Sequence, residues 1–363
     1  MEVVALSTQA AKQEASLSEK ITKAIPGLIL VTILAFAAVS WDGWFKANFK
    51  ELRSTLSLNY VFAAIIFGMV IRNTVGVPNV FEPGLKFSTV FTKTGIVIMG
   101  LKYTWASLVD VGGMSMVFIT VTLFGTVWLM FALKKRYNLT DTLGGCLSAG
   151  FAICGVSATV ATGPSIRAKG QEMAYTIASI LIFGLLMLFI LPPIGKAIGL
   201  TQNEFGAWVG VSIVNSAQVL AAGFAYGEGA GLMAGIFNMG RVILLPFVVL
   251  YVVMQVLGRE SAEAKEINKT KFVMDKFPLF VLAFMAVMAM NTAGVFSAGE
   301  IKQGKLFMEY AFTLGFASIG LTTKFSDMKA AGKDGIILGF VVALIKAVFA
   351  LAVIKLFLGP ILG

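Results

Sequence analysis

The chain has 363 residues, of which 58% are hydrophobic and 13% charged, and its formal net charge at pH 7 is +10. A soluble fold of this length cannot bury so much apolar surface, so the composition excludes an ordinary cytosolic enzyme and predicts an all-α polytopic membrane protein. Histidine is absent, which excludes a His-based catalytic triad and His-ligated metal sites, and two cysteines exclude a disulfide scaffold. No nucleotide-binding motif or Cys-pair metal pattern is present. We therefore expect no catalytic residues, no metal and no cofactor.

Apolar runs dominate the chain from residue 24 onward. A bilayer-spanning helix requires about 20 mostly apolar residues, and these runs do not alternate in polarity as the strands of a membrane barrel do. We expect residues 1–23 to form a cytoplasmic tail, and the charged stretch 258–276 to be a cytoplasmic linker between two transmembrane parts, 24–257 and 277–363. About eleven spans are predicted, at 24–40, 60–76, 84–101, 113–133, 144–163, 172–192, 205–225, 231–257, 277–295, 304–322 and 334–358.

The loops show a strong charge asymmetry. Those on the same side as the N-terminus hold most of the Lys and Arg residues, including 134–136 and 259–276. Because cytoplasmic loops are rich in Lys and Arg, the N-terminus is predicted to be cytoplasmic, and an odd number of spans places the C-terminus in the periplasm or outside the cell. No basic run is interleaved with aromatic residues, so we expect a lipid bilayer as partner and no nucleic acid.

Two parts of the chain resemble each other, spans two to four (about 60–133) and spans nine to eleven. Glycine is costly within a helix, so glycines matched in one register indicate a repeat. Corresponding spans are seven apart in order, an odd number, so the two copies run through the bilayer in opposite directions. Inverted repeats of this kind are typical of secondary transporters that work by alternating access. The segment 73–77 matches 291–295, and residues 220 apart match in the pairs Gly84 and Gly304, Gly95 and Gly315, Gly100 and Gly320, and Gly112 and Gly332.

The middle span of each copy contains the matched glycines Gly95 and Gly315. Helices that break near the membrane midplane expose backbone groups to a substrate, so we expect two broken helices that cross near these glycines, with Thr313 and Ser318 beside the second. The alternative is close helix packing through small residues. A second, weaker resemblance links two polar segments, 148–159 and 210–219. Simple counting makes their helices parallel, which conflicts with an inverted repeat, so the sequence leaves this resemblance open.

Ionisable side chains within membrane spans are costly, which makes them functional candidates. Four lie deep in the predicted spans: Lys93, Arg241, Glu309 and Lys346. We expect Lys93 to bind an anion at the crossing, or to take the place of a bound cation by holding the helix ends together. The alternative is a structural ion pair with Glu309. We expect Arg241 to supply a second positive charge, and Lys346 to extend its ammonium group to the membrane surface.

The most polar cluster in any span is formed by Asn215, Ser216 and Gln218. Such side chains need hydrogen-bonding partners in hydrocarbon, so they fit an oxyanion, a water-filled cavity or hydrogen bonds between helices. A second segment, closed by Pro164, offers a helix break together with a hydroxyl group, and we expect it to line the same cavity. Its residues are Cys154, Gly155 and Ser157.

Five stretches carry a family resemblance: Gly95-Ile-Val-Ile-Met-Gly100-Leu-Lys, Ala152-Ile-Cys-Gly-Val-Ser-Ala158 with Pro164, Ser216-Ala-Gln-Val-Leu-Ala-Ala222, Arg241 to Pro246, and Gly320-Leu-Thr-Thr323. Together they resemble the YeiH-like bacterial inner-membrane proteins, described as sulfate exporters. The resemblance implies a fold similar to that of sodium/proton antiporters and bile-acid symporters, with a core domain, a panel domain and a homodimer. It also implies cations at Lys93 and Arg241. The family's His-acid pair is Val214-Asn215 here, which removes a protonatable group from the polar centre.

These observations predict a secondary active transporter of a small anion, either sulfate, sulfite or an organosulfonate, that works by elevator-type alternating access in the bacterial inner membrane. A sodium or proton antiporter of the same fold is the alternative, and Glu309 is the only acid that could titrate at its centre. A membrane-embedded enzyme and a passive channel are more remote alternatives.

Overall fold

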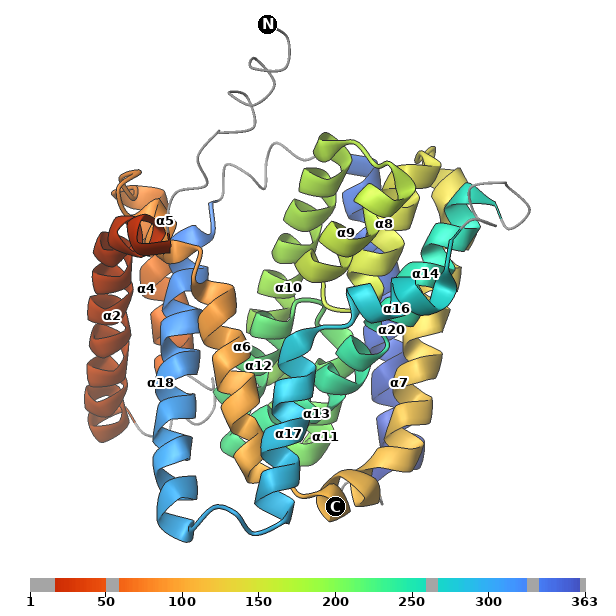
Figure 1. Cartoon of the computed structure of the whole chain (residues 1–363). Coiled ribbons are helices and arrows are strands. Elements are labelled where there is room, and N and C mark those ends of the chain that lie inside the picture. Colours follow the sequence, from red (N-terminus) through yellow and green to blue (C-terminus); the bar gives the residue numbers. More distant parts are fainter. Residues whose placement is uncertain (1–16, 50–58, 259–266, 325–332, 360–363) are drawn as a thin grey trace, which may run out of the picture.

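The computed structural model describes residues 17–49, 59–258, 267–324 and 333–359, and every regular element in these ranges is helical (Figure 1). Residues 1–16 of the expected tail and 259–266 of the expected linker lie outside this description, as does Gly332 of the repeat. Helix α2 (Leu17–Asn48) begins before the first apolar run, within the expected tail, and α16 (Lys269–Lys276) lies within the expected linker.

Each of the eleven apolar runs falls on described helices, but the number of spans is not confirmed. By length and composition, four helical segments of the described chain could cross a membrane: 22–48, 115–137, 170–197 and 334–358. Two bent helix pairs bring the number to six if each pair is one span, with bends of 45° and 70°. Large apolar side chains remain exposed on these helices, and Phe36 of α2 is 75% exposed. This surface fits a lipid environment, which supports a multi-pass membrane location.

The helices pack in two groups that lie side by side (Figure 1). In the first helix group, α18 is central and contacts α2, α4 and α6, while α17 packs on α6. In the second, α11 and α12 pack on α13, and α8 packs between α7 and α10. The first helix group consists of α2, α4 (Tyr60–Thr74), α5 (Glu82–Leu85), α6 (Ser88–Met99), α17 (Leu279–Thr292) and α18 (Ala298–Thr322). The second consists of α7 (Trp105–Leu133), α8 (Asp141–Ala152), α9 (Val156–Thr162), α10 (Gly170–Ala197), α11 (Gln202–Ser212), α12 (Ser216–Tyr226), α13 (Glu228–Ile243), α14 (Leu245–Leu257) and α20 (Lys333–Val353).

The helices that contain Gly95 and Gly315 are continuous, so the prediction of chain breaks at these two positions is wrong. Both glycines serve helix packing instead. A Cβ at Gly95 would lie 2.5 Å from the Phe312 ring, and a Cβ at Gly315 would lie 2.8 Å from Thr92 Oγ1. The absence of a side chain lets α6 and α18 approach closely, which was the alternative interpretation.

The chain breaks lie in the second helix group, in the two polar segments that resembled each other weakly. One separates α8 from α9 at Ile153–Gly155, and the other separates α11 from α12 at Ile213–Asn215. Gly155 has φ +75°, a conformation that residues with a Cβ rarely adopt. Asn215 begins α12 as its N-cap, because its side chain accepts from two backbone amides of the first turn.

Two hydrogen bonds join segments that the predicted repeat pairs with each other. Asn73 Nδ2 donates to the carbonyl oxygen of Thr323 at 2.9 Å, and Asn291 Nδ2 donates to that of Tyr103 at 3.0 Å. Asn73 and Asn291 are matched residues of the two copies, and the two acceptors are 220 residues apart, the repeat distance. Each predicted copy therefore donates to a carbonyl oxygen that follows the glycine-containing helix of the other.

Candidate functional site

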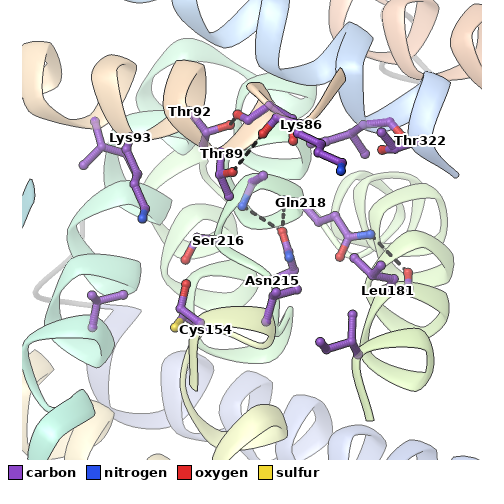
Figure 2. A pocket seen from close by; sticks show the side chains of 18 of the residues that line it. Lys86, Thr89, Thr92, Lys93, Cys154, Leu181, Asn215, Ser216, Gln218 and Thr322 are labelled. Carbon is purple, nitrogen blue, oxygen red and sulfur yellow. Dashed lines mark hydrogen bonds between the residues drawn. The ribbon is translucent and has the colours of Figure 1, made fainter. Parts of the chain in front are cut away.

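A cavity of about 500 Å³ lies between the two helix groups. The first helix group contributes α5, α6 and the C-terminal end of α18 to its wall, and the second contributes α9, α10 and α12 together with both chain breaks. Figure 2 shows Lys93 of α6 extending toward the opposite wall, where Ser216 lies. The cavity brings together six of the predicted site residues: Lys93, Cys154, Ser157, Asn215, Ser216 and Gln218.

The charged lining of this cavity is entirely cationic among the described residues. It contains Lys86, Lys93, Lys276 and Lys324, and no Asp or Glu. Lys324 Nζ lies 3.7 Å from Glu82, a carboxylate that also pairs with Arg72. Lys93 is exposed to the cavity, has no ion pair within the described chain, and lies 5.3 Å from the centroid of the Phe280 ring. The cavity therefore favours an anionic ligand.

The alternative role of Lys93, an ion pair with Glu309, is wrong. Glu309 lies 3.8 Å from Lys305 on its own helix and does not line the cavity. Lys305 also pairs with Glu228 at 2.7 Å. This cluster holds α18 to the start of α13 outside the cavity, and it leaves Lys93 without a carboxylate partner.

Some polar groups of the second chain break form hydrogen bonds within the protein, and others face the cavity. Asn215 Oδ1 accepts from the backbone amides of Ala217 at 3.0 Å and Gln218 at 3.3 Å. Gln218 is 3% exposed, and its Nε2 donates to Leu181 O at 3.1 Å. Asn215 is half-buried in the cavity wall, and its Nδ2 donates to no described residue. This amide can therefore donate to a ligand.

The first chain break presents a hydroxyl group to the cavity. Ser157 is exposed there, while Cys154 is 7% exposed and lies at the bottom of the wall. Gly155 does not line the cavity. Its role is to shape the break, because a Cβ there would lie 2.7 Å from Ile180 Cγ2.

Arg241 lies behind the second break instead of in the cavity. Its side chain is 1% exposed, and Nη1 donates to Ile213 O at 2.8 Å. Nη2 donates to Asn238 Oδ1 at 3.0 Å, and the same oxygen accepts from Ser216 Oγ at 2.9 Å. Arg241 therefore acts on the cavity through Asn238 and Ser216, and no sequence pattern had singled out Asn238.

The remaining predicted residues lie on helices that support the cavity. Gly95, Thr313, Gly315 and Ser318 do not line it. Thr313 Oγ1 donates to Glu309 O at 2.7 Å within its own helix, and Ser318 is buried. The cavity is instead lined by the next turn of α18 and by α6 residues that the sequence interpretation missed. These are Thr89, Thr92, Ile319, Thr322 and Thr323.

Three of the four cavity lysines were interpreted only as markers of membrane topology. Lys86, Lys276 and Lys324 lie at helix ends, where a positive charge already has an explanation. Their convergence on one cavity depends on the packing of α5, α16 and α18. The prediction that Lys346 extends to the membrane surface is also wrong, because its side chain is 5% exposed and Nζ donates to Phe151 O at 2.8 Å.

Comparisons with known proteins place these features in a family. The family model described as conserved hypothetical protein 698 matches residues 26–339. A UPF0324 membrane protein of Nitratidesulfovibrio vulgaris is 50% identical, covering 97% of this chain and 98% of that protein. The UPF0324 inner membrane protein YeiH of Escherichia coli K12 is 29% identical, covering 87% of this chain and 89% of that protein. No solved structure matches.

Proposed function

The chain belongs to the UPF0324 family of membrane proteins, and from this premise we propose that it is a secondary active transporter of a small anion. The observation that carries the proposal is the charge of the cavity: four lysines and no carboxylate among the described lining residues. Within a membrane protein, groups of one charge sign that converge on a cavity mark an ion or substrate pathway.

Elevator-type alternating access is the mechanism that we propose. The cavity lies between two helix groups, so a displacement of one group against the other would move the bound anion across the barrier. The inverted repeat belongs to this proposal. It is supported by the exchanged pair of hydrogen bonds from Asn73 and Asn291. It is also supported by the packing of Gly95 of α6 against Phe312 of α18, and of Gly315 of α18 against Thr92 of α6.

The proposed substrate is sulfate, sulfite or an organosulfonate. Oxyanions of this kind accept hydrogen bonds on several oxygens, and the cavity offers donors on different sides. Lys93 extends from the first helix group, while Ser157 and Asn215 belong to the two chain breaks. The remaining wall is largely apolar, with Leu181 and Phe280 among its residues, so an organosulfonate with a small apolar body also fits the lining.

The antiporter alternative is not favoured. It requires a titratable acid at the centre, and Glu309 lies outside the cavity. The proposal contains no enzymatic step. We also propose a homodimer, as the family resemblance implies, and native mass spectrometry of the purified protein would test it. A protein that stays monomeric in lipid nanodiscs would contradict the dimer.

The first test is a thermal-stability screen of the purified protein with sulfate, sulfite, thiosulfate, taurine, other sulfonates, carboxylates and chloride at matched ionic strength. A ligand that binds only the folded state raises the melting temperature by mass action. We expect a saturable rise with one anion class that is lost in Lys93→Ala and kept in Lys102→Ala. Lys102 is the matched control, because it lies outside the cavity lining and 3.6 Å from Glu228.

Transport itself is tested in proteoliposomes by counterflow of the radiolabelled anion that the screen identifies. A carrier gives saturable counterflow, whereas a passive channel does not. If no anion shifts the melting temperature, or if Lys93→Ala binds and transports as the unsubstituted protein does, the proposed site is wrong.

A further inference from the structure

The carbonyl end of α8, at the first chain break, is occupied by a nitrogen donor from a distant helix. Lys346 of α20 is 5% exposed, and its Nζ donates to Phe151 O at 2.8 Å. Phe151 belongs to the last turn of α8, where carbonyl groups have no amide of their own helix to pair with. The ε-amino group therefore meets an acceptor that the break would otherwise leave buried and unpaired.

The carbonyl end of α11, at the second chain break, is occupied in the same way from the other side. Arg241 of α13 is 1% exposed, and its Nη1 donates to Ile213 O at 2.8 Å, with Val211 O at 3.5 Å. Val211 lies in the last turn of α11 and Ile213 follows that helix directly. Two different helices, α13 and α20, thus each supply one long basic side chain to one of the two breaks.

Helix C-termini carry partial negative charge, and half-helix C-termini inside a membrane are places where Na⁺ can be coordinated by free carbonyl groups. In this chain both such ends already have a donor that is covalently attached to the protein. Within the described residues there is also no group of three acidic or cysteine side chains that could hold a metal ion. At each break a basic side chain therefore already donates to a carbonyl oxygen that a mobile cation could otherwise bind.

We propose that Arg241 and Lys346 replace a coupling metal cation at the two chain breaks, so that the anion site is complete without Na⁺ or K⁺. This inference rests on the proposed transport function for its meaning, because it makes the transporter independent of sodium. For the protein itself it means that the side chains of Arg241 and Lys346 hold the two breaks, and that the breaks bind no metal cation. Both residues are positioning residues, since neither lines the cavity.

The decisive measurement is the melting temperature of the unsubstituted protein in NaCl, KCl and choline chloride at constant ionic strength and constant chloride. We expect the three values to agree within about 1 °C, because no folded-state site binds the cation. A saturable rise with Na⁺ or K⁺ relative to choline would overturn the proposal. This measurement uses the unsubstituted protein and requires no substrate.

A second measurement tests whether Lys346 acts as a replaceable donor. Lys346→Ala removes the ε-amino group, and Lys302→Ala is the control, because Lys302 is solvent-exposed on α18 and does not line the cavity. We expect Lys346→Ala to melt several degrees lower than the control. Small primary ammonium ions such as ethylammonium should raise its melting temperature at constant ionic strength, and should leave the control and the unsubstituted protein unchanged.

Equal stability of Lys346→Ala and Lys302→Ala would overturn the role of Lys346. If Lys346→Ala does not fold, Lys346→Arg is tested in its place, because it keeps a donor and should fold. The proposal is contradicted if neither variant folds and the melting temperature of the unsubstituted protein rises with Na⁺. The cation series and the anion screen are separate. Absence of any anion shift would overturn the transport proposal alone, and a sodium shift would overturn the tethered-donor proposal alone.

Discussion

Ser216 at the cavity wall donates to Asn238 Oδ1 at 2.9 Å, and this one oxygen also accepts from the buried Arg241 guanidinium at 3.0 Å. Asn238 is fully buried in α13. It therefore links Arg241, which donates to the end of α11, to Ser216, the first residue of α12. The orientation of a polar residue in the cavity is determined by a side chain that no ligand in the cavity would touch.

Asn238→Leu should be strongly destabilising, because it leaves the buried Arg241 with one partner fewer and Ser216 without its acceptor. We expect a loss of about 2–4 kcal/mol in the free energy of unfolding. Asn238→Asp keeps the acceptor oxygen and should be milder. The measurement is the melting temperature, with Gln255→Leu on the exposed side of α14 as control. Equal effects of the two leucine variants would show that the shared oxygen is unimportant.

Gly155→Ala should disturb the first chain break. The residue has φ +75°, and the added Cβ would lie 2.7 Å from Ile180 Cγ2. We expect a cost of about 1–3 kcal/mol in stability, with weaker anion binding because Ser157 follows two residues later. Gly125→Ala is the control, since a Cβ there meets nothing within 4 Å. If both variants melt at the same temperature, the left-handed conformation at Gly155 is not required.

Gly320→Ala should separate α18 from α4. A Cβ at this position would lie 2.4 Å from the carbonyl oxygen of Ile65, and backbone atoms cannot move away as a side chain can. Overpacking of this kind costs about 1–3 kcal/mol. Gly299→Ala on the same helix is the control, because the nearest atom to its Cβ is 3.9 Å away. The comparison uses urea or thermal unfolding in detergent, and a Gly320→Ala protein as stable as the control would contradict the close approach.

The lysines at the edge of the cavity should act differently from Lys93. Lys86→Ala should weaken anion binding modestly, and the loss should shrink as salt is added, because the proposed site places Lys93 against the anion and leaves Lys86 to act through an attraction that salt screens. Lys93→Ala should weaken binding more, at every salt concentration. Binding of the radiolabelled anion at low and physiological ionic strength measures both effects. Equal salt dependence of the two variants would show that both lysines act only through long-range attraction.

A membrane location and an all-helical fold follow from composition alone, because 58% hydrophobic residues in long uninterrupted runs cannot be buried in a soluble fold. Half of the predicted site residues also line the cavity. Buried hydrogen-bonding residues such as Asn215 and Gln218 are expensive in hydrocarbon, so their presence signals a polar cavity wherever it lies. These inferences require no knowledge of which helices are neighbours.

Which of the candidate glycines breaks its helix, by contrast, was decided by tertiary packing. Glycine permits both a break and a close helix approach, and only the neighbour shows which of the two applies. At Gly95 the neighbour is the Phe312 ring, which takes the place of a side chain, whereas at Gly155 the backbone itself turns to φ +75°. The role of a basic residue is ambiguous in the same way. Lys346 could extend to the membrane surface or donate to Phe151 O, and this is settled by α8 ending beside α20, a relation between residues 195 apart in the chain.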